Sequence, residues 1–428
     1  MMEYIPATLK VLLVFFAVLI AIRRRLSLGN AFLIGAVLLG LIFGLAPKTM
    51  IRSIFSSVIY PKTLSLAVIV SLILVLSSTM EKVGQMKRLL AHFRGLITQP
   101  ILNLAVFPAL IGLLPMPGGA VFSAPMVKEL GDETRLTPDR LSFINYWYRH
   151  IWEYWWPLYP GVLLATALAE LNLWTFVITM FPLSIIAVSS GWLSIRGISN
   201  HTNASTAPSH ASTPLKPFLK ELTPILFVIV FGLGAGLFLS VIFPGWSISK
   251  ETGLIVALCL AIAWIWHEND WPKAQIVKII TDTNLLNMMY MVIAILVFKG
   301  MLEDSHAVKA ISQEFQAQHI PLIVLNIVLP FLVGIVTGIT IAFVGSTFPI
   351  LILLIQAYGE TPFMTAYIML AIASGFIGVL FSPLHLCLLL TNQYFSCTLG
   401  HAYKLLWLPC LSLFVFCVGY FYLLRYLF

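Results

Sequence analysis

The chain has 428 residues, of which 60% are hydrophobic and only 10% are charged. Soluble globular domains carry about 25% charged residues, so this composition excludes secreted, nuclear and cytosolic soluble proteins. The net charge of +8 comes without a basic patch interleaved with aromatic residues. We therefore interpret it as the excess of Lys and Arg on the cytoplasmic side of a membrane protein, and we expect no nucleic-acid partner.

Apolar runs long enough to cross about 30 Å of hydrocarbon follow one another along the chain and predict a bundle of membrane helices. In the first half they lie at about residues 5–22, 29–46, 62–80, 98–126, 139–168 and 172–193. The first run precedes three arginines and has no small-residue cleavage site, so we expect a first span and not a signal peptide. Residues 194–220 are polar and have the composition of a linker. In the second half the apolar runs lie at about residues 221–243, 251–266, 282–301, 320–355, 362–393 and 405–427.

The two sets of runs match in order, and parts of them align without gaps. At an offset of 222 residues, Glu81 aligns with Glu303, Lys87 with Lys309, Pro108 with Pro330 and Gly112 with Gly334. The offset grows to 224 for Pro125 and Pro349, and to 226 for Pro157 and Pro383. We therefore predict two structural repeats, residues 1–193 and 221–428, joined by a cytoplasmic linker at 194–220.

Each repeat is expected to contain two or three scaffold helices, a re-entrant hairpin, a broken helix and a last helix. If the hairpin enters and leaves on one side, each repeat has five full crossings, and this odd number inverts the second repeat. Both termini are then external, and most basic residues are cytoplasmic. The predicted ranges are 1–80, 98–130, 137–168 and 172–193 in the first repeat, and 221–301, 320–358, 362–396 and 405–427 in the second.

Four places in these runs predict backbone that leaves the helix within the membrane, where only burial in protein or a wet cavity can satisfy it. Two are hairpin tips, at 114–120 (Leu-Pro-Met-Pro-Gly-Gly-Ala) and at 337–340 leading to 345–347 (Gly-Ser-Thr). Two are helix breaks, one in the run 141–168, within the stretch 145–161, and one at 373–376 with 382–385. An ordinary kinked helix is the alternative for either tip.

The first helix break carries charge in an aromatic-rich stretch. Arg149 and Glu153 are four residues apart, so they can pair on one helical face. Trp and Tyr gather at bilayer interfaces, and an anchoring belt with a structural Arg–Glu pair is therefore one interpretation. The other is a functional site, in which Arg149 clamps an anion and His150 or Glu153 carries a proton.

The second helix break contains Ser382 and His385, and His385 is interpreted more readily as a packing residue than as a proton carrier. Hydroxyls and unwound carbonyls suit Na⁺, so a sodium site near Gly338, Ser374 and Gly375 is a further hypothesis. The five cysteines form no C-x-x-C pair and have no His at zinc-ligand spacing, so packed thiols are expected. No resident metal or cofactor is predicted.

The order of three helices, a hairpin, a broken helix and a last helix in each half resembles the ion-transporter superfamily of secondary carriers. The motifs at 114–125 and 382–395 are similar to those of a prokaryotic integral-membrane family within it, known mainly as a domain of unknown function. The resemblance implies that tips and breaks meet near the midplane, in a domain that moves past a scaffold, and by analogy a homodimer. Sodium–dicarboxylate members carry Ser-Asn-Thr tips, whereas this chain carries Pro-Gly-Gly, and its charged group favours proton coupling.

These observations predict an all-α polytopic membrane protein of elevator type in the cytoplasmic membrane of a prokaryote, which transports a small organic anion with H⁺ or Na⁺. The substrate-binding residues are expected to be Pro117, Gly118, Gly119, Ser123, Asn145, Arg149, Thr340, Gly345, Ser346, Thr347, Ser382 and His385, and the proton-coupling residues His150 and Glu153. A translocase of a lipid-linked phosphate is an alternative, and a passive channel is less favoured. No G-x-S-x-G or H-E-x-x-H motif is present, so an enzyme is not expected.

Overall fold

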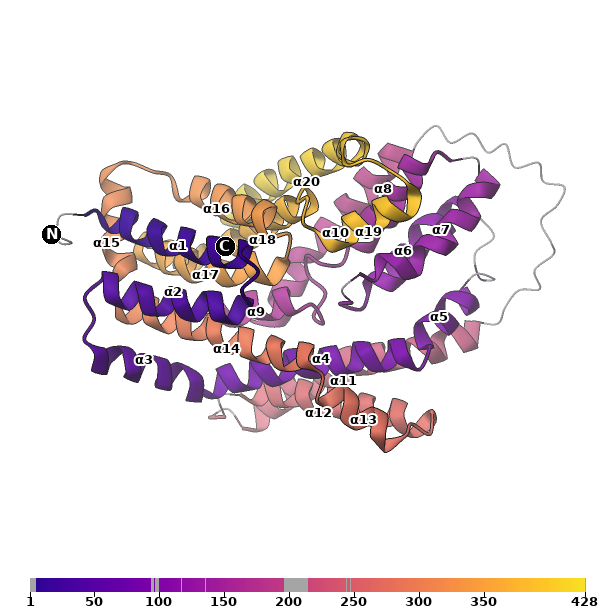
Figure 1. The fold of residues 1–428 in the computed structure, drawn as a ribbon, viewed down its shortest axis with the longest axis horizontal. Coiled ribbons are helices and arrows are strands. Elements are labelled where there is room, and N and C mark those ends of the chain that lie inside the picture. The colour runs from indigo at the N-terminus through magenta and orange to yellow at the C-terminus, as the bar shows by residue number, and fades with distance from the viewer. Residues whose placement is uncertain are drawn as a thin grey trace.

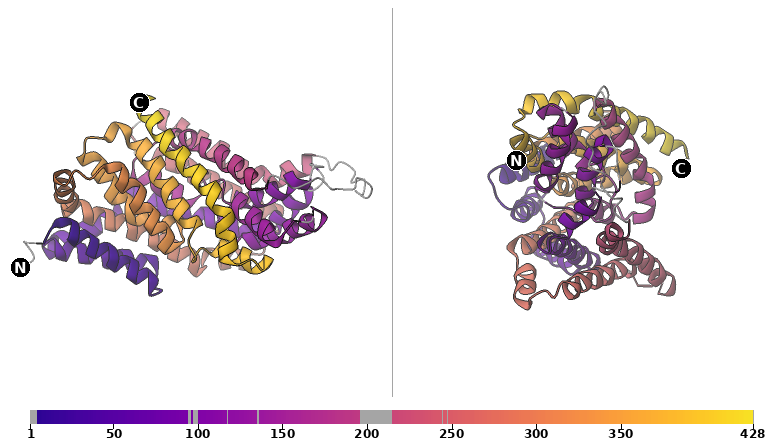
Figure 2. Two further views of the ribbon diagram at one scale, coloured as in Figure 1. Left: turned by 90° about the horizontal axis from the view of Figure 1, so that it is seen from above. Right: turned by 90° about the vertical axis from the view of Figure 1, so that its right-hand side faces the viewer.

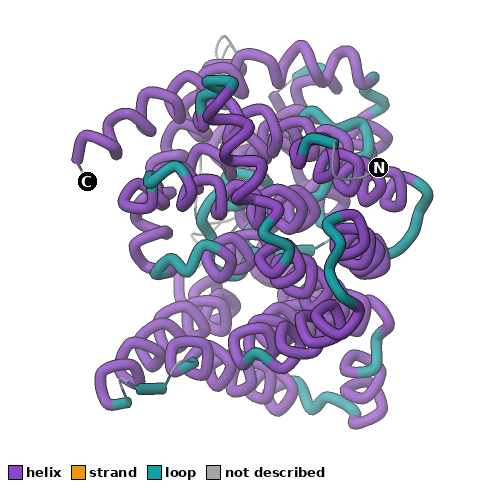
Figure 3. The backbone as a smooth tube through the Cα atoms, turned by 90° about the vertical axis from the view of Figure 1, so that its left-hand side faces the viewer, coloured by secondary structure: helices purple, strands orange, loops and turns teal. Residues whose placement is uncertain are grey.

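A computed structural model describes residues 5–93, 96, 100–116, 118–134, 136–195, 215–243, 245–246 and 248–427. The regular structure of this part of the chain is helical and includes no β-strand (Figures 1 and 3). Eight of the helices described are long and apolar enough to cross a bilayer, and the bent pair α15–α16 would make a ninth span. The protein is therefore a multi-pass membrane protein.

The helices of the first half are α1 (Ala7–Arg23), α2 (Leu28–Ile42), α3 (Pro47–Ile59), α4 (Pro61–Lys82), α5 (Gln85–Phe93), α6 (Pro100–Gly112), α7 (Ala120–Thr134), α8 (Pro138–Arg149), α9 (Pro160–Leu168) and α10 (Leu173–Ile195). Residues 196–214, most of the predicted linker, lie outside the described residues. The helices of the second half are α11 (Leu215–Ile242), α12 (Ser249–Glu268), α13 (Lys273–Ile280), α14 (Thr283–Asp304), α15 (Ala307–Ala317), α16 (Leu322–Thr337), α17 (Thr340–Ala357), η2 (Thr361–Phe363), α18 (Met364–Leu380), α19 (Leu386–Phe395) and α20 (Leu399–Leu427).

Four short helices, α3, α5, α13 and α15, join the apolar ones and were not predicted. Each is amphipathic and too short to span a bilayer, so hydropathy over long windows misses it. In α5, for example, Met86, Leu89 and Leu90 are buried whereas Lys87 is exposed. Such helices suit the boundary between membrane and water.

Two layers of helices build the molecule, as Figures 1 and 2 show from different sides. The scaffold layer contains α2, α4, α11, α12 and α14 with the short α3 and α13, and the core layer contains α6–α10 and α16–α20. The centre of the core layer is α18, which is buried almost throughout. By contrast, α11 exposes Val230 and Phe238, as expected for a helix that faces lipid.

Contacts between helices occur in matched pairs whose labels differ by ten. In the scaffold layer, α2 packs on α14 and α12 packs on α4, while α3 contacts α14 and α13 contacts α4. In the core layer, α6 packs on α8 and α16 on α18, while α9 contacts α17 and α19 contacts α7. In the α4–α14 and α10–α20 contacts, each helix packs directly on its counterpart from the other half. The two halves thus use equivalent helices for equivalent contacts.

Candidate functional site

The first hairpin is formed by α6 and α7, and its tip is held against the first helix break. Gly118 has a positive φ of 72° at the turn, while Pro117 lies outside the described residues. A side chain at Gly112 would overlap the carbonyl oxygen of Arg149, so only glycine allows α6 and α8 to approach this closely. The Tyr159 hydroxyl donates a hydrogen bond to the Gly112 carbonyl (2.6 Å).

The second hairpin is formed by α16 and α17, with its tip at Gly338, whose φ is +66°. A Cβ atom at Gly338 would lie 2.8 Å from Ser382 Oγ and 2.9 Å from the His385 backbone nitrogen. Ser382 Oγ donates to the Ile335 carbonyl (2.7 Å), and His385 Nδ1 lies 2.7 Å from the Gly338 carbonyl oxygen. This tip is therefore held against the second helix break, as the first tip is against the first.

The offsets predicted from the sequence relate these two attachments. Trp156 and Ser382 are 226 residues apart, and they donate to the carbonyls of Leu113 and Ile335, which are 222 apart, so these two bonds between break and hairpin are equivalent. Gly334 also packs closely, because a side chain there would overlap the Gly375 carbonyl oxygen. Gly112 makes the same close approach to the carbonyl of Arg149, which precedes Gly375 by 226 residues, so the contacts agree with the predicted alignment of Gly112 with Gly334 at offset 222.

The helix breaks differ in part from the prediction. The chain leaves the helix between Arg149 and Pro160, and again between Leu380 and Leu386, as expected. The predicted interruption at residues 373–376 is wrong, because α18 continues through Ser374 and Gly375. Gly375 is needed there for close packing, since a side chain would overlap the Phe343 ring.

The aromatic stretch of the first break is buried and does not form an interfacial belt. Tyr146, Trp147 and Tyr154 are at most 2% exposed. Trp152 and Trp156 donate their indole N–H groups to carbonyls of the first hairpin, Ala109 (2.7 Å) and Leu113 (2.9 Å). These rings therefore attach the break to the hairpin.

Arg149 is the buried cation of the site, with 2% of its surface exposed. Its Nη2 donates to the Met116 carbonyl at the first tip (2.7 Å), and its Nη1 lies 4.0 Å from Glu153 Oε1. Among the described residues no acceptor reaches its Nε–H. Gly119 makes room for the guanidinium, because a side chain there would overlap Nη2.

Asn145 links the first hairpin, α8 and α19. Ser123 Oγ donates to Asn145 Oδ1 (2.6 Å), and Asn145 Nδ2 donates to the Ala120 carbonyl (3.0 Å) and to Thr391 Oγ1 (3.2 Å). All three side chains are buried. The structure thus brings together the predicted residues Ser123 and Asn145 and adds Thr391.

The two histidines of the breaks face each other. His150 Nδ1 lies 2.6 Å from the Tyr146 carbonyl oxygen, and the Nε2 atoms of His150 and His385 are 3.1 Å apart. Glu153 Oε1 lies 3.7 Å from His150 Nε2, and Thr340 Oγ1 donates to Glu153 Oε2 (3.4 Å). Residues from both breaks and from the second tip therefore meet at one point.

Other predicted residues lie apart from this point. Gly345, Ser346 and Thr347 belong to α17 beyond the tip, where Ser346 and Thr347 donate to carbonyls of their own helix (2.7 and 2.8 Å). Ser374 and Gly375 lie within α18 and are not among the nearest neighbours of Gly338 at the tip, which are Ser382, Leu384 and His385. Sequence reasoning missed Met116, Tyr159 and Cys387, although the His-Leu-Cys spacing after Pro383 signals the last of these.

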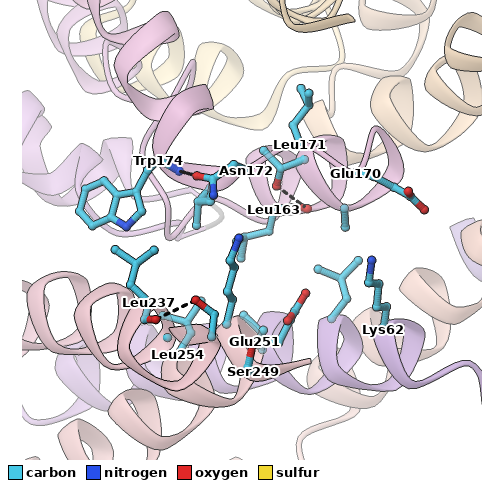
Figure 4. Close-up of a pocket in the computed structure, with 18 of the residues that line it drawn as sticks. Lys62, Leu163, Glu170, Leu171, Asn172, Trp174, Leu237, Ser249, Glu251 and Leu254 are labelled. Carbon is cyan, nitrogen blue, oxygen red and sulfur yellow. Dashed lines mark hydrogen bonds between the residues drawn. The ribbon is translucent and has the colours of Figure 1, made fainter. Parts of the chain in front are cut away.

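Two cavities, of 600 and 330 Å³, lie between the scaffold and core layers, and neither is lined by residues of the charged site. Figure 4 shows the larger one, where the α9–α10 connection with Glu170 and Asn172 faces α4 and α12. Lys62, Lys250 and Glu251 add charge to its lining. Lys62 and Glu170 line both cavities.

The fold and site thus define a polytopic helical membrane protein with a buried charged cluster where two hairpins and two helix breaks meet. The family model described as "Protein of unknown function (DUF401)" matches residues 8–423, and the chain belongs to this family. No protein among those with curated descriptions matches the sequence.

Proposed function

We propose that this protein is a secondary active transporter of a small organic anion in the cytoplasmic membrane, coupled to protons or sodium ions. The main support for the proposal is the buried guanidinium of Arg149. Its Nε–H donates a hydrogen bond to no described residue. An unsatisfied buried donor is costly, and a planar carboxylate or phosphonate can accept from it while Nη2 keeps its bond to Met116.

The matched contacts of the two halves support a pair of inverted repeats with an elevator mechanism. Broken helices and hairpin tips near a pseudo-two-fold axis are the usual site architecture of such carriers. Two cavities lie along the boundary between the scaffold and core layers, which supports movement of one layer past the other. A mobile core layer would carry Arg149 with all four site segments.

The facing histidines support ion coupling by protons. Each Nδ1 lies against a carbonyl, which can only accept, so each Nδ1 is protonated and each neutral Nε2 carries a lone pair. A proton held between His150 and His385 resolves the contact of these lone pairs. Glu153 Oε1 lies 3.7 Å from His150 Nε2 and 4.0 Å from Arg149 Nη1, so the carboxylate is close to both the proposed proton site and the proposed anion site.

A thermal-shift screen of the detergent-purified protein tests the anion proposal. The panel contains small carboxylates, sulfonates and phosphonates and, separately, lipid phosphates, each at two pH values with and without Na⁺. We expect a small anion to raise the melting temperature, and Arg149→Gln to weaken its binding by about 10- to 100-fold, the cost of a charged hydrogen bond.

Arg425→Gln is the matched control, because Arg425 forms an ion pair with Glu360 (2.8 Å) outside the site. It should leave anion affinity unchanged. Wild-type affinity in Arg149→Gln would remove the clamp role of Arg149. Stabilisation by lipid phosphates alone would overturn the small-anion proposal and favour a lipid translocase.

A further inference from the structure

The contact between His150 and His385 suits a cation, and a metal ion fits it as well as a proton does. Because both Nδ1 atoms lie 2.6–2.7 Å from carbonyl oxygens, the ring protons are fixed there. Two Nε2 lone pairs then face each other at 3.1 Å. Zinc–nitrogen bonds of about 2.0–2.1 Å at a tetrahedral angle hold two nitrogens about 3.3 Å apart.

A third donor completes a ligand set. One ring nitrogen of each histidine and Cys387 Sγ all lie within 4.8 Å of one another. Thiolate with imidazole is the donor set of zinc sites, whereas Na⁺ and Mg²⁺ prefer oxygen ligands. Cys387 and His150 are buried, and His385 is partly exposed.

The two imidazole rings are held in the way that metal-bound histidines usually are. Metal-bound histidines usually donate their second N–H to a carbonyl or carboxylate, which fixes the ring. The Tyr146 and Gly338 carbonyls hold the two rings in this way. The Gly338 carbonyl is itself fixed by the second hairpin tip, so the orientation of His385 belongs to the architecture of the site.

The charges also permit a dication beside Arg149. The Glu153 carboxylate and a Cys387 thiolate would together balance a charge of +2. Glu153 Oε1 lies 3.7 Å from His150 Nε2, so its charge is close to the cluster. An ion at this point would leave Arg149 with less competition from Glu153 for an anionic partner.

We propose that His150, His385 and Cys387 bind one thiophilic metal ion of the Zn²⁺ type, which joins the first helix break to the second. Direct metal binding to the purified full-length protein tests this proposal without a transport assay. A negative metal-binding result would therefore not bear on anion transport. A negative anion-binding result would not bear on the metal site.

Cobalt(II) serves as the spectroscopic probe, titrated anaerobically into metal-stripped protein in detergent. We expect one Co²⁺ per chain, a near-ultraviolet thiolate-to-cobalt charge-transfer band, visible bands of tetrahedral intensity, and displacement by one equivalent of Zn²⁺. Cys387→Ser should abolish the charge-transfer band and weaken Zn²⁺ binding at least tenfold, and His385→Gln should weaken it similarly.

Cys417→Ser is the matched control, since Cys417 is a buried thiol of α20 outside the cluster. It should retain the band and the affinity. Absence of stoichiometric Co²⁺ and Zn²⁺ binding by the wild-type protein would overturn the proposal, whatever the variants do. A charge-transfer band that survives in Cys387→Ser would overturn the ligand assignment.

Discussion

At the scale of residues, two glycines next to Arg149 have different structural roles. Gly112 faces the Arg149 backbone carbonyl, which the packing of α6 on α8 holds in place. Gly119 faces the end of the Arg149 side chain, which can rotate away. One glycine therefore governs helix packing, whereas the other governs the position of a guanidinium.

Alanine substitutions should separate these effects. We expect Gly112→Ala to destabilise the protein by about 1–3 kcal/mol, the usual cost of overpacking against atoms that cannot move. Gly119→Ala should change stability little but weaken anion binding, because it displaces Nη2. Unfolding measurements and the melting-temperature response to the identified anion check both expectations. Equal stability losses in the two variants would contradict this distinction.

At the scale of elements, the junction of α7, α8 and α19 depends on one amide. Asn145 uses its oxygen for Ser123 and its nitrogen for Ala120 and Thr391. Ser142 of α8 likewise donates to Asn392 of α19 (2.6 Å). Polar contacts thus fix the first hairpin and α19 to the same helix, where apolar packing alone allows slippage.

Replacing this amide tests its structural role. We expect Asn145→Leu to lower the free energy of unfolding by about 2–4 kcal/mol, because it leaves several buried polar groups without partners. Asn284→Leu, at an exposed position of α14, is the control and should change stability by no more than about 0.5 kcal/mol. Denaturant unfolding of both variants provides the comparison. A loss below about 1 kcal/mol in Asn145→Leu would show that the junction does not depend on the amide.

At the scale of the whole molecule, the boundary between the scaffold and core layers is the surface on which the proposed movement occurs. Both cavities lie on it, and α4 contributes to both linings. Lys62 belongs to the scaffold layer, and Glu170 belongs to the α9–α10 connection of the core layer. A covalent bridge between these two positions would fix one layer against the other.

Cross-linking tests the elevator mechanism. In a cysteine-depleted background that retains Cys387, Lys62→Cys with Glu170→Cys should lose anion uptake into proteoliposomes when joined by a cleavable bifunctional reagent. Cleavage should restore uptake. Ser240→Cys with Glu251→Cys, both within the scaffold layer and lining the larger cavity, is the control pair. Full uptake by a completely cross-linked Lys62–Glu170 pair would exclude relative movement at this boundary.

The sequence by itself determined the membrane class, the two sets of apolar runs, and the breaks next to Pro157 and Pro383. The apolar runs follow from hydropathy, and the breaks follow from the backbone N–H that proline lacks. Both are local properties of the sequence. The four short amphipathic helices were missed because their apolar faces are short. A break at Gly375 was wrongly predicted because this glycine makes room for the Phe343 ring within a continuous α18. Only the tertiary structure decided the cluster of His150, His385 and Cys387, because its histidines are 235 residues apart and meet through the packing of two hairpins on two broken helices.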